Sequence, residues 1–310
     1  AASAHAAGYL ATATAEYRAL LGEHPELADA WANLGMALQD AGDLDGSVEA
    51  YRAAVARQPA DSVTRNRLGD ALLAAGRPGE AMASADRCLE ADPGNPGAIA
   101  AQAVALVDLD RDAEARDLLA MNREGRAVPL APPPGYASLG DFNRDLVDFV
   151  AGHPSRRYEP VGHATRKGSH TRDLLGGDPG PVGLLADAIR TAVTGYIGSV
   201  SLPARHPFPG PVPPDHRLVI WAVIMDQYGH QLPHIHPAAW LSGVYYAELP
   251  EDVGVQSGHE GWIEFGQPPD ELVHGAAHPV QLFRPAEGTL FLFPSYLYHR
   301  TVPFSTGRRR

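Results

Sequence analysis

The sequence predicts a two-domain protein, in which an all-helical solenoid is followed by a C-terminal β-sheet domain of the jelly-roll, cupin-like type. Three observations support this: proline recurs at an even interval in the first third, a proline-rich break follows, and the texture changes from alanine-rich to β-rich beyond Pro214. With 310 residues and 45% hydrophobic content, the chain can build two separate cores.

The N-terminal third carries a repeated pattern. Pro25, Pro59 and Pro93 are evenly spaced, and each ends a helical stretch. Between the prolines, small and apolar positions recur at the same interval: Leu34 and Leu68, Gly35 and Gly69, Leu38 and Leu72, Gly42 and Gly76, Ala54 and Cys88. This pattern resembles the tetratricopeptide repeat, a helix–turn–helix unit with small residues where helices approach closely.

The ends of the repeat region are incomplete. Residues 8–24 resemble the second helix of an earlier repeat, and residues 97–120 a degenerate last one with Gln102 in place of leucine. Because a solenoid unit buries its apolar face against a neighbour, we expect further repeats upstream. The repeats are expected to bind a peptide or protein; scaffolding and homodimer formation remain alternatives.

A stiff connector is predicted between the two domains, because prolines cannot continue a helix. Helices are expected near 141–152 and 181–198, and the polar stretch between them reads as a loop whose His163 and His170 lie at the surface. The predicted domains are a repeat domain (1–126), a linker (127–135) and a second domain (136–310) with a helical shoulder (136–200) and a jelly-roll core (215–310).

Composition excludes several classes of function. The net charge of -12, with Lys167 the single lysine, argues against nucleic acid or an anionic membrane as the main partner. No apolar run approaches the length of a membrane span. The single cysteine, Cys88, excludes an internal disulfide framework and fits a reducing, cytoplasmic compartment.

The last third reads as many short strands separated by Gly/Pro turns, which favours a sandwich or barrel over a parallel sheet with crossover helices. The expected strands are Arg217–Asp226, Trp240–Ala247, Gly261–Phe265, Val280–Phe283 and Thr289–Pro294.

Three histidines in this region are candidate metal ligands. His234 and His236 lie at i and i+2 of an extended segment, so their side chains share a face. His299 follows much later and can join them only if the fold brings distant strands together, as double-sheet jelly rolls do. Imidazoles suit Fe, Zn, Cu or Ni. The loop histidines His259, His274 and His278 are expected at the surface.

Residues 136–310 resemble the Fe(II)/2-oxoglutarate-dependent oxygenases, particularly a bacterial branch. The matching motifs are His234-Ile-His236-Pro, Ser242-Gly-Val-Tyr-Tyr246, Gly261-Trp-Ile-Glu-Phe265 and Phe293-Pro-Ser-Tyr-Leu-Tyr-His299. The resemblance implies that His234 and His299 bind the metal. His236 stands where most of the superfamily has aspartate; it is either the third ligand or a neighbour of the ligands, with water, Asp226 or Glu264 completing the sphere.

The resemblance also assigns cosubstrate residues. Arg310 or, by same-face alternation, Arg308 matches the arginine that binds the distal carboxylate of 2-oxoglutarate. Tyr228, Tyr246 and Ser242 match positions at the cosubstrate.

The implied function is a dioxygenase that uses Fe(II), 2-oxoglutarate and molecular oxygen to hydroxylate a C–H bond of a peptide, protein or amino-acid-derived substrate, with the repeat domain binding substrate or partner. Two alternatives stay open: a three-histidine dioxygenase that does not use 2-oxoglutarate, and a non-catalytic cupin-like module in a repeat scaffold.

Overall fold

The structure is a computed structural model that describes residues 1–119, 125–200, 206, 208, 216–250, 253, 258–274 and 277–304. It divides into two compact units. The helical unit comprises Ala1–Leu118 with Asp270–His278, and the sheet unit comprises Leu119–Pro269 with Pro279–Arg310. None of the described helices is both long and apolar enough to span a membrane.

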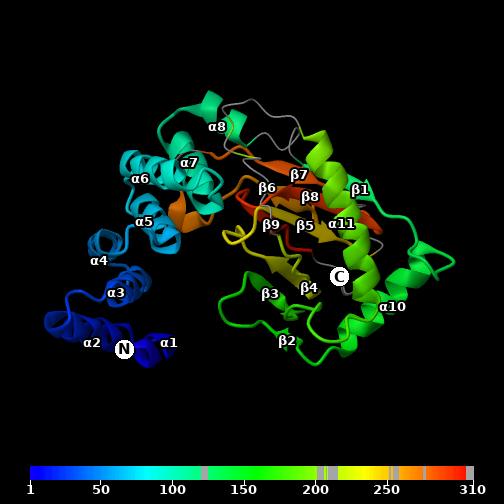
Figure 1. The fold of residues 1–310 in the computed structure, drawn as a ribbon, viewed down its shortest axis with the longest axis horizontal. Helices are drawn as coiled ribbons and strands as arrows, with labels where there is room; N and C mark the ends of the chain where they lie inside the picture. Colours follow the sequence, from blue (N-terminus) through cyan, green and yellow to red (C-terminus); the bar gives the residue numbers. More distant parts are fainter. Residues whose placement is uncertain are drawn as a thin grey trace. The chain divides into compact units, whose positions relative to one another are not determined.

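The helical unit is a run of antiparallel hairpins in which each helix packs on its sequence neighbours (Figure 1). This confirms the predicted all-α repeat architecture. Asp43, Asp61 and Asn95 cap helix N-termini by accepting backbone N–H bonds. The helices are α1 (Ala2–Ala6), α2 (Leu10–Glu23), α3 (Ala28–Asp40), α4 (Leu44–Arg57), α5 (Ser62–Ala74), α6 (Pro78–Ala91), α7 (Pro96–Asp108) and α8 (Asp112–Leu118).

The turn between the two helices of each repeat requires a left-handed backbone conformation. Gly42 and Gly76 take it with φ of 81° and 66°, as glycine does without steric cost. At the matching place in the next repeat, Asp110 takes it with φ of 57°. Asp and Asn tolerate this region better than other non-glycine residues, so the degenerate last repeat keeps the turn of the others.

Close helix packing explains the other recurring glycine. A Cβ on Gly35 of α3 would lie 2.9–3.0 Å from ring atoms of Tyr51 on α4, and Tyr51 is only 1% exposed. Around them Tyr17, Leu34 and Leu38 belong to one buried cluster. A small residue is therefore a packing requirement here.

A short piece from the last third of the sequence belongs to the helical unit. Its 3-10 helix η1 (Asp270–Leu272) packs on α5, and the His274 ring lies 2.6 Å from the Leu73 carbonyl oxygen. His278 is buried, at 7% exposure, so the predicted surface position is wrong for His278. Packing of η1 and His274 against α5, which lies far away in sequence, brings this segment into the helical unit.

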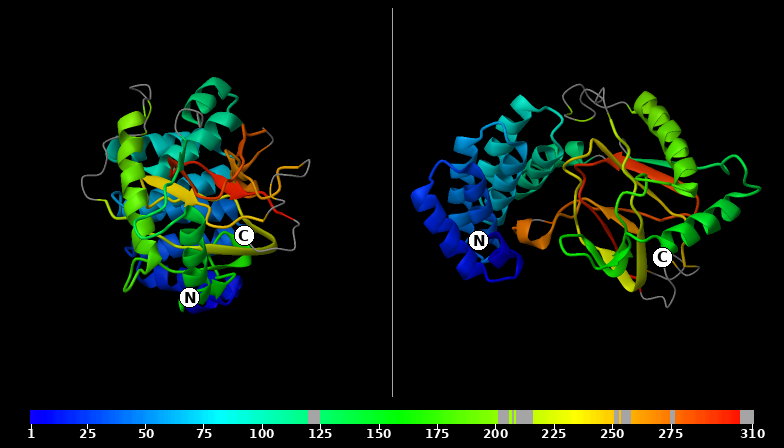
Figure 2. Two further views of the ribbon diagram at one scale, coloured as in Figure 1. Left: turned by 90° about the vertical axis from the view of Figure 1, so that its right-hand side faces the viewer. Right: turned by 60° about the horizontal axis from the view of Figure 1, so that its bottom comes forward.

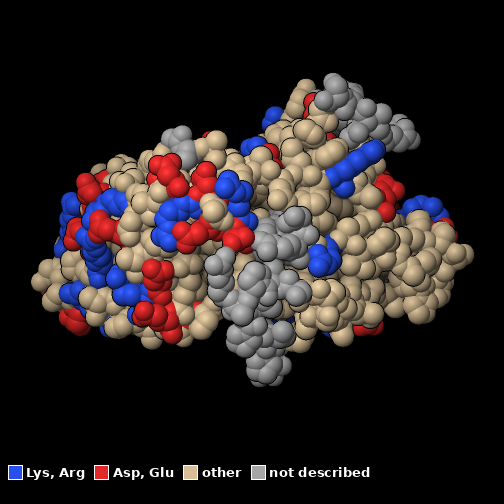
Figure 3. Space-filling model, turned by 90° about the horizontal axis from the view of Figure 1, so that it is seen from above, with Lys and Arg blue, Asp and Glu red and all other residues tan. Residues whose placement is uncertain are grey.

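Charged side chains of both signs are interleaved over the repeat helices on the face drawn in Figure 3. Several form ion pairs between neighbouring turns or hairpins, such as Arg52 with Glu49 and Glu80, and Arg77 with Glu80. Exposed pairs of this kind contribute little to stability individually.

The sheet unit contains three antiparallel sheets, each of three described strands, with orders β1-β8-β5, β2-β3-β4 and β7-β6-β9. This confirms a sheet-rich C-terminal domain, although these strands do not close into one barrel within the described ranges. The strands are β1 (Arg126–Pro129), β2 (Arg157–Tyr158), β3 (Thr165–His170), β4 (Val223–Gln231), β5 (Leu241–Tyr245), β6 (Ile263–Phe265), β7 (Gln281–Phe283), β8 (Thr289–Pro294) and β9 (His299–Thr301).

The predicted connector differs from the structure at its start. Strand β1 runs into the proline-rich stretch and pairs with β8, with Ala127 opposite Phe291 and Pro129 opposite Thr289. β1 is the edge strand of its sheet, and an edge strand can accept proline at its end because one side of it needs no backbone donor.

The first expected strand, Arg217–Asp226, is shifted by several residues: β4 begins only at Val223. The residues before Val223 run beside residues 171–174, but some of their backbone N–H groups donate to side chains of that segment instead of to backbone carbonyls. Ala222 N–H donates to Thr171 Oγ1 (2.9 Å) and Ile220 N–H to Asp173 Oδ1 (3.3 Å). Side-chain acceptors that replace backbone carbonyls interrupt a regular ladder.

Helices α10 (Leu139–Gly152) and α11 (Pro181–Ser199) pack together beside the strands, close to their predicted ranges (Figures 1 and 2). Ser138 caps α10 by accepting the Asp141 N–H. Buried side chains from both helices, including Phe142, Leu146 and Leu185, form one cluster with residues of the 220–224 segment. This helical layer becomes one wall of the site described next.

Candidate metal centre

Three histidines converge in the sheet unit. One nitrogen each of His234, His236 and His299 lie within 4.8 Å of one another. The ring centroids are 4.2 Å apart for His234 and His299, and 5.1 Å apart for each pair that includes His236. Among the residues described, this is a set of donors that can hold one metal ion.

Backbone hydrogen bonds produce this convergence. His234 and His299 form an isolated antiparallel bridge, with N–H···O distances of 3.1 and 3.0 Å. His236 N–H donates to the carbonyl of Ser295 (3.1 Å), in the turn between β8 and β9. The segment that follows β4 is thereby joined at two points to the segment that carries His299.

Hydrogen bonds fix which ring nitrogens face the centre. Nδ1 of His234 lies 2.8 Å from the Leu232 carbonyl, and Nδ1 of His299 lies 2.9 Å from the Leu297 carbonyl. Because a carbonyl oxygen only accepts, each Nδ1 carries the proton. Nε2 of both rings is left with its lone pair free for a metal.

Burial keeps these rings neutral. It lowers the pKa of His234 and His299 below the ordinary value, and lowers the pKa of His236 to about 4, with neighbouring imidazoles acting in the same direction on His299 and His236. A metal binds the neutral imidazole, so no proton has to leave these rings near neutral pH.

The expected carboxylate alternative is occupied elsewhere. Glu264 is 7% exposed and forms a bidentate pair with Arg300, at 2.6 and 3.1 Å. The two residues face each other across β6 and β9, where Phe265 stands opposite His299. Asp226 lies outside the group of converging donors, and it has a partner of its own. His236 is thus the third donor that the geometry brings to the centre.

Aromatic side chains enclose the donors. Phe293 meets the His299 ring edge-on with centroids 4.7 Å apart, and Phe265 lies 6.1 Å from it. On the other side, the Trp221 ring lies 5.3 Å from His236. Such packing holds ligand side chains in one orientation.

The predicted cosubstrate residues separate in the structure. A cavity of about 1020 Å³ contains the three histidines and is also lined by Ser242 and Tyr246. The Ser242 hydroxyl lies 2.7 Å from that of Ser295, and Tyr246 is 7% exposed. Tyr228 instead is 49% exposed, with the Lys167 ammonium 5.1 Å from its ring centroid. Arg308 and Arg310 lie outside the described residues.

Sequence reasoning missed the neighbours of this centre. His170 was expected in a surface loop, but it ends β3, stacks on Trp221 at 6.0 Å, and contacts His163 at 4.3 Å. Burial lowers the pKa of His170, with His163 as a further cause and His234 as a smaller one. The segment Thr165–His170 is too polar to be predicted as a strand, and its pairing with β4 makes it one.

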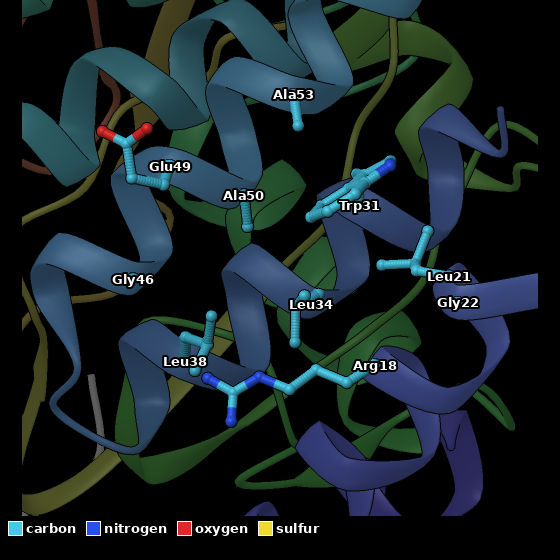
Figure 4. A pocket seen from close by; sticks show the side chains of 10 residues that line it. All are labelled: Arg18, Leu21, Gly22, Trp31, Leu34, Leu38, Gly46, Glu49, Ala50 and Ala53. Carbon is cyan, nitrogen blue, oxygen red and sulfur yellow. The ribbon is translucent and has the colours of Figure 1, made fainter. Parts of the chain in front are cut away.

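The helical unit has a separate hollow of about 630 Å³ between α2, α3 and α4. Figure 4 shows Trp31, Leu34 and Leu21 around this space, with Arg18 and Glu49 also at its edge. An apolar floor with charges of both signs is a surface that can hold a peptide.

Two parts of the chain match models of known protein families. Residues 219–310 match the model described as "Putative 2OG-Fe(II) oxygenase", and tetratricopeptide repeat models match residues 3–62, 34–96 and 72–124. The chain joins tetratricopeptide repeats to a 2OG-Fe(II) oxygenase domain. The three histidines lie inside the part that matches the oxygenase model.

Solved structures are similar to parts of this chain. A Thermobaculum terrenum O-GlcNAc transferase mutant is 25% identical, with a TM-score of 0.35. The match covers 43% of this chain and 27% of the transferase chain. A Pseudomonas putida prolyl-4-hydroxylase is 14% identical, covering 67% of this chain and 94% of its own, with a TM-score of 0.42.

A Trichoplax adhaerens prolyl hydroxylase, solved in complex with a peptide fragment of the hypoxia inducible factor oxygen degradation domain, is 12% identical. The match covers 65% of this chain and 89% of that one, with a TM-score of 0.43. The comparison with curated proteins found no match to this chain.

Proposed function

We propose that this protein is an Fe(II)- and 2-oxoglutarate-dependent hydroxylase, with His234, His236 and His299 as the protein ligands of the metal. The observation that carries the proposal is the convergence of three neutral imidazoles within 4.8 Å inside the oxygenase domain.

The donor set fits iron. Neutral imidazoles suit Fe(II), and three ligands leave coordination positions for other molecules. When bound, the metal and 2-oxoglutarate would supply the oxidising chemistry that activates molecular oxygen for attack on a C–H bond. Three imidazoles leave the ion its full charge of about +2, one unit more than a set with a carboxylate, so retention of the metal rests on the enclosure of the site.

The chain's own contribution is orientation and exclusion of water. The carbonyls of Leu232 and Leu297 hold two rings with Nε2 inward, and Phe265 and Phe293 pack on His299. We further propose that Arg310 or Arg308 holds the distal carboxylate of 2-oxoglutarate through paired N–H donors. Ser242 and Tyr246, which line the same cavity as the histidines, are proposed to complete the cosubstrate site.

The proposed substrate is a peptide, a protein or an amino-acid derivative. The repeat hollow around Trp31 supports a role of the repeats in binding substrate or partner. A cytoplasmic location is part of the same proposal, because free Cys88 is buried and needs no oxidising compartment.

The first experiment measures succinate released from 2-oxoglutarate by iron-loaded protein, with iron content measured in parallel. The native protein should release succinate, and His299→Ala should lose both iron and succinate. A His299→Ala protein that keeps iron, together with a native protein that makes no succinate, would overturn the proposal.

Four further substitutions separate the alternatives. His236→Asp should retain iron and His236→Ala should lose most of it, if the third imidazole is a ligand. If Arg308→Ala and Arg310→Ala both leave oxygenase activity unchanged, the three-histidine dioxygenase that does not use 2-oxoglutarate becomes the better description.

A further inference from the structure

The cavity at the metal centre extends far beyond the histidines. Its volume of about 1020 Å³ lies at the upper end of the range for small-molecule sites, roughly 300–1,000 Å³. The histidines occupy one region of its lining; the remainder comes mainly from α10, α11, residues 216–225 and residues 238–248. A metal and a small dicarboxylate need only a part of this space.

The rest of the wall is mostly aliphatic, and part of it is left open. Ile197, Val219 and Trp221 line this cavity and are 36–38% exposed. Exposed large apolar side chains that gather at one hollow mark a binding surface. Water would gain few partners along such a wall, so an apolar ligand fits it better.

Polar groups along the wall already have partners in the protein. Thr194 donates to the Arg190 carbonyl at 3.0 Å, and the Tyr245 hydroxyl donates to Asn143 at 2.6 Å. Ser242 is hydrogen-bonded to Ser295, and Arg300 is paired with Glu264. A peptide backbone needs free donors and acceptors, which makes an alkyl chain the better occupant.

One side of the apolar wall is formed by a single helix. Val182, Leu185, Ile189, Val193 and Ile197 line the cavity at helical spacing along α11. The fifteen rises from Val182 to Ile197, at about 1.5 Å each, extend for about 22 Å. At roughly 1.3 Å per carbon for an extended chain of ~1.5 Å bonds, this length corresponds to about 17 carbons.

Two of the arginines that line the cavity lie on α11 and in residues 216–225. Arg217 lines the cavity and makes no hydrogen bond or ion pair with any described residue, and Arg190 of α11 has only an exposed pair with Asp187 (2.8 Å). Glu248 lines the cavity too, but follows β5 on another element. Arg190 lies midway between Val182 and Ile197, so it cannot meet the end of a ligand that follows the whole stretch. The Arg217 guanidinium suits a carboxylate head.

We propose that this cavity binds a substrate with a linear long-chain acyl group and a carboxylate head, the chain lying along α11 and the head at Arg217. This inference rests on the proposed function and names its substrate class. Two sources share the chemistry: a free fatty acid, and an amino acid that carries an N-acyl chain.

Binding is measured directly by calorimetry on the full chain, with 2-oxoglutarate present at saturation so that the probe cannot fill the cosubstrate place. The probes are hexadecanoic acid, N-hexadecanoylglycine and hexadecanol. The variant Val193→Trp fills the channel, and Thr191→Trp is its matched control, since Thr191 lies on the exposed face of the same helix. Arg217→Gln tests the head.

The native protein should bind both acids, with the tighter one identifying the source. Val193→Trp should weaken binding by at least about tenfold and Thr191→Trp by less than about twofold. Arg217→Gln should weaken the acids and leave hexadecanol unchanged. If Val193→Trp does not fold, Ile197→Asp at the more exposed end of the channel replaces it.

The inference is overturned if native protein binds none of the three probes, or if both tryptophan variants lose binding equally. It fails independently of the proposed function if succinate is formed with peptides but neither hexadecanoic acid nor N-hexadecanoylglycine binds. Binding of the acids without any succinate would instead overturn the proposed function and leave the acyl site standing.

Discussion

The helical unit and the oxygenase domain are held together in opposite ways. In the helical unit each helix contacts the next one along the chain, and the packing positions recur from one repeat to the next. In the oxygenase domain His234 meets His299, which lies far along the chain, and β1 pairs with β8. Stability in the first is distributed over similar local contacts; chemistry in the second depends on a few distant ones.

Because of this difference, we expect substitutions in the two units to have different effects. Changes in the repeats should alter unfolding without altering metal binding, whereas changes at the histidines should abolish metal binding with little effect on the helices. The following substitutions test whether unfolding and metal binding respond separately.

The largest effect is expected for His299→Ala. Loss of one of three imidazoles should lower iron affinity by at least about a hundredfold and reduce succinate release to background, because outer contacts alone already change affinity by about 10–100-fold. Circular dichroism should show unchanged helix content. A parallel loss of helical signal would break the division between the units.

Substitution at Gly35 should destabilise the helical unit and spare the metal. In Gly35→Ala the new Cβ would press on the buried Tyr51 ring, so stability should fall by about 1–3 kcal/mol although alanine favours helix. Gly22→Ala is the control, since nothing lies within 4 Å of its Cβ; it should stabilise by up to about 1 kcal/mol. Thermal unfolding and iron content report the two effects separately.

Glu264→Gln tests the strand pair that supports His299. Arg300 would lose its bidentate carboxylate, and stability of the oxygenase domain should fall by about 1–3 kcal/mol. Iron affinity should fall by less than about tenfold, since Glu264 touches no ligand ring in the described contacts. An iron loss as large as that of His299→Ala would make Glu264 part of the centre.

The smallest effect concerns pH and the helical unit. Burial raises the pKa of Asp70 from 3.8 to about 7; Glu271 adds to the rise and Arg67 opposes it. Between these values the folded unit keeps a proton that the unfolded chain releases, so its stability should fall as pH rises through this window.

Asp70→Asn removes this dependence. It should raise the free energy of unfolding by roughly 1–2 kcal/mol at pH 8, since Asp70 is only partly buried, and change it little near pH 4. Denaturant titrations at the two pH values are the measurement. Equal effects at both values would mean that the carboxyl is ionised throughout.

Sequence periodicity predicted the helices well because their contacts are local. The even spacing of Pro25, Pro59 and Pro93 and the glycines at 42 and 76 indicated the repeat. The left-handed position of Asp110 in the last repeat was found only in the structure. Strands β5 and β8 were also found within a few residues, since turn residues bound them.

Other elements had no readable local signal. β3 is polar, β9 is three residues long, and the start of β4 is set by the side chains of Thr171 and Asp173. Strand pairing is decided by the partner strand as much as by the residues of the strand itself.

The sequence by itself determined the residue types of the site and the two domain classes. His234, His236 and His299 stood out because a motif set restricts chemistry more than any one residue does. Only the tertiary structure decided that His236 joins the other two while Glu264 turns to Arg300, and that a cavity lined in part by α11 contains the three histidines. These choices depend on which distant backbone groups find each other, and a linear pattern does not record that.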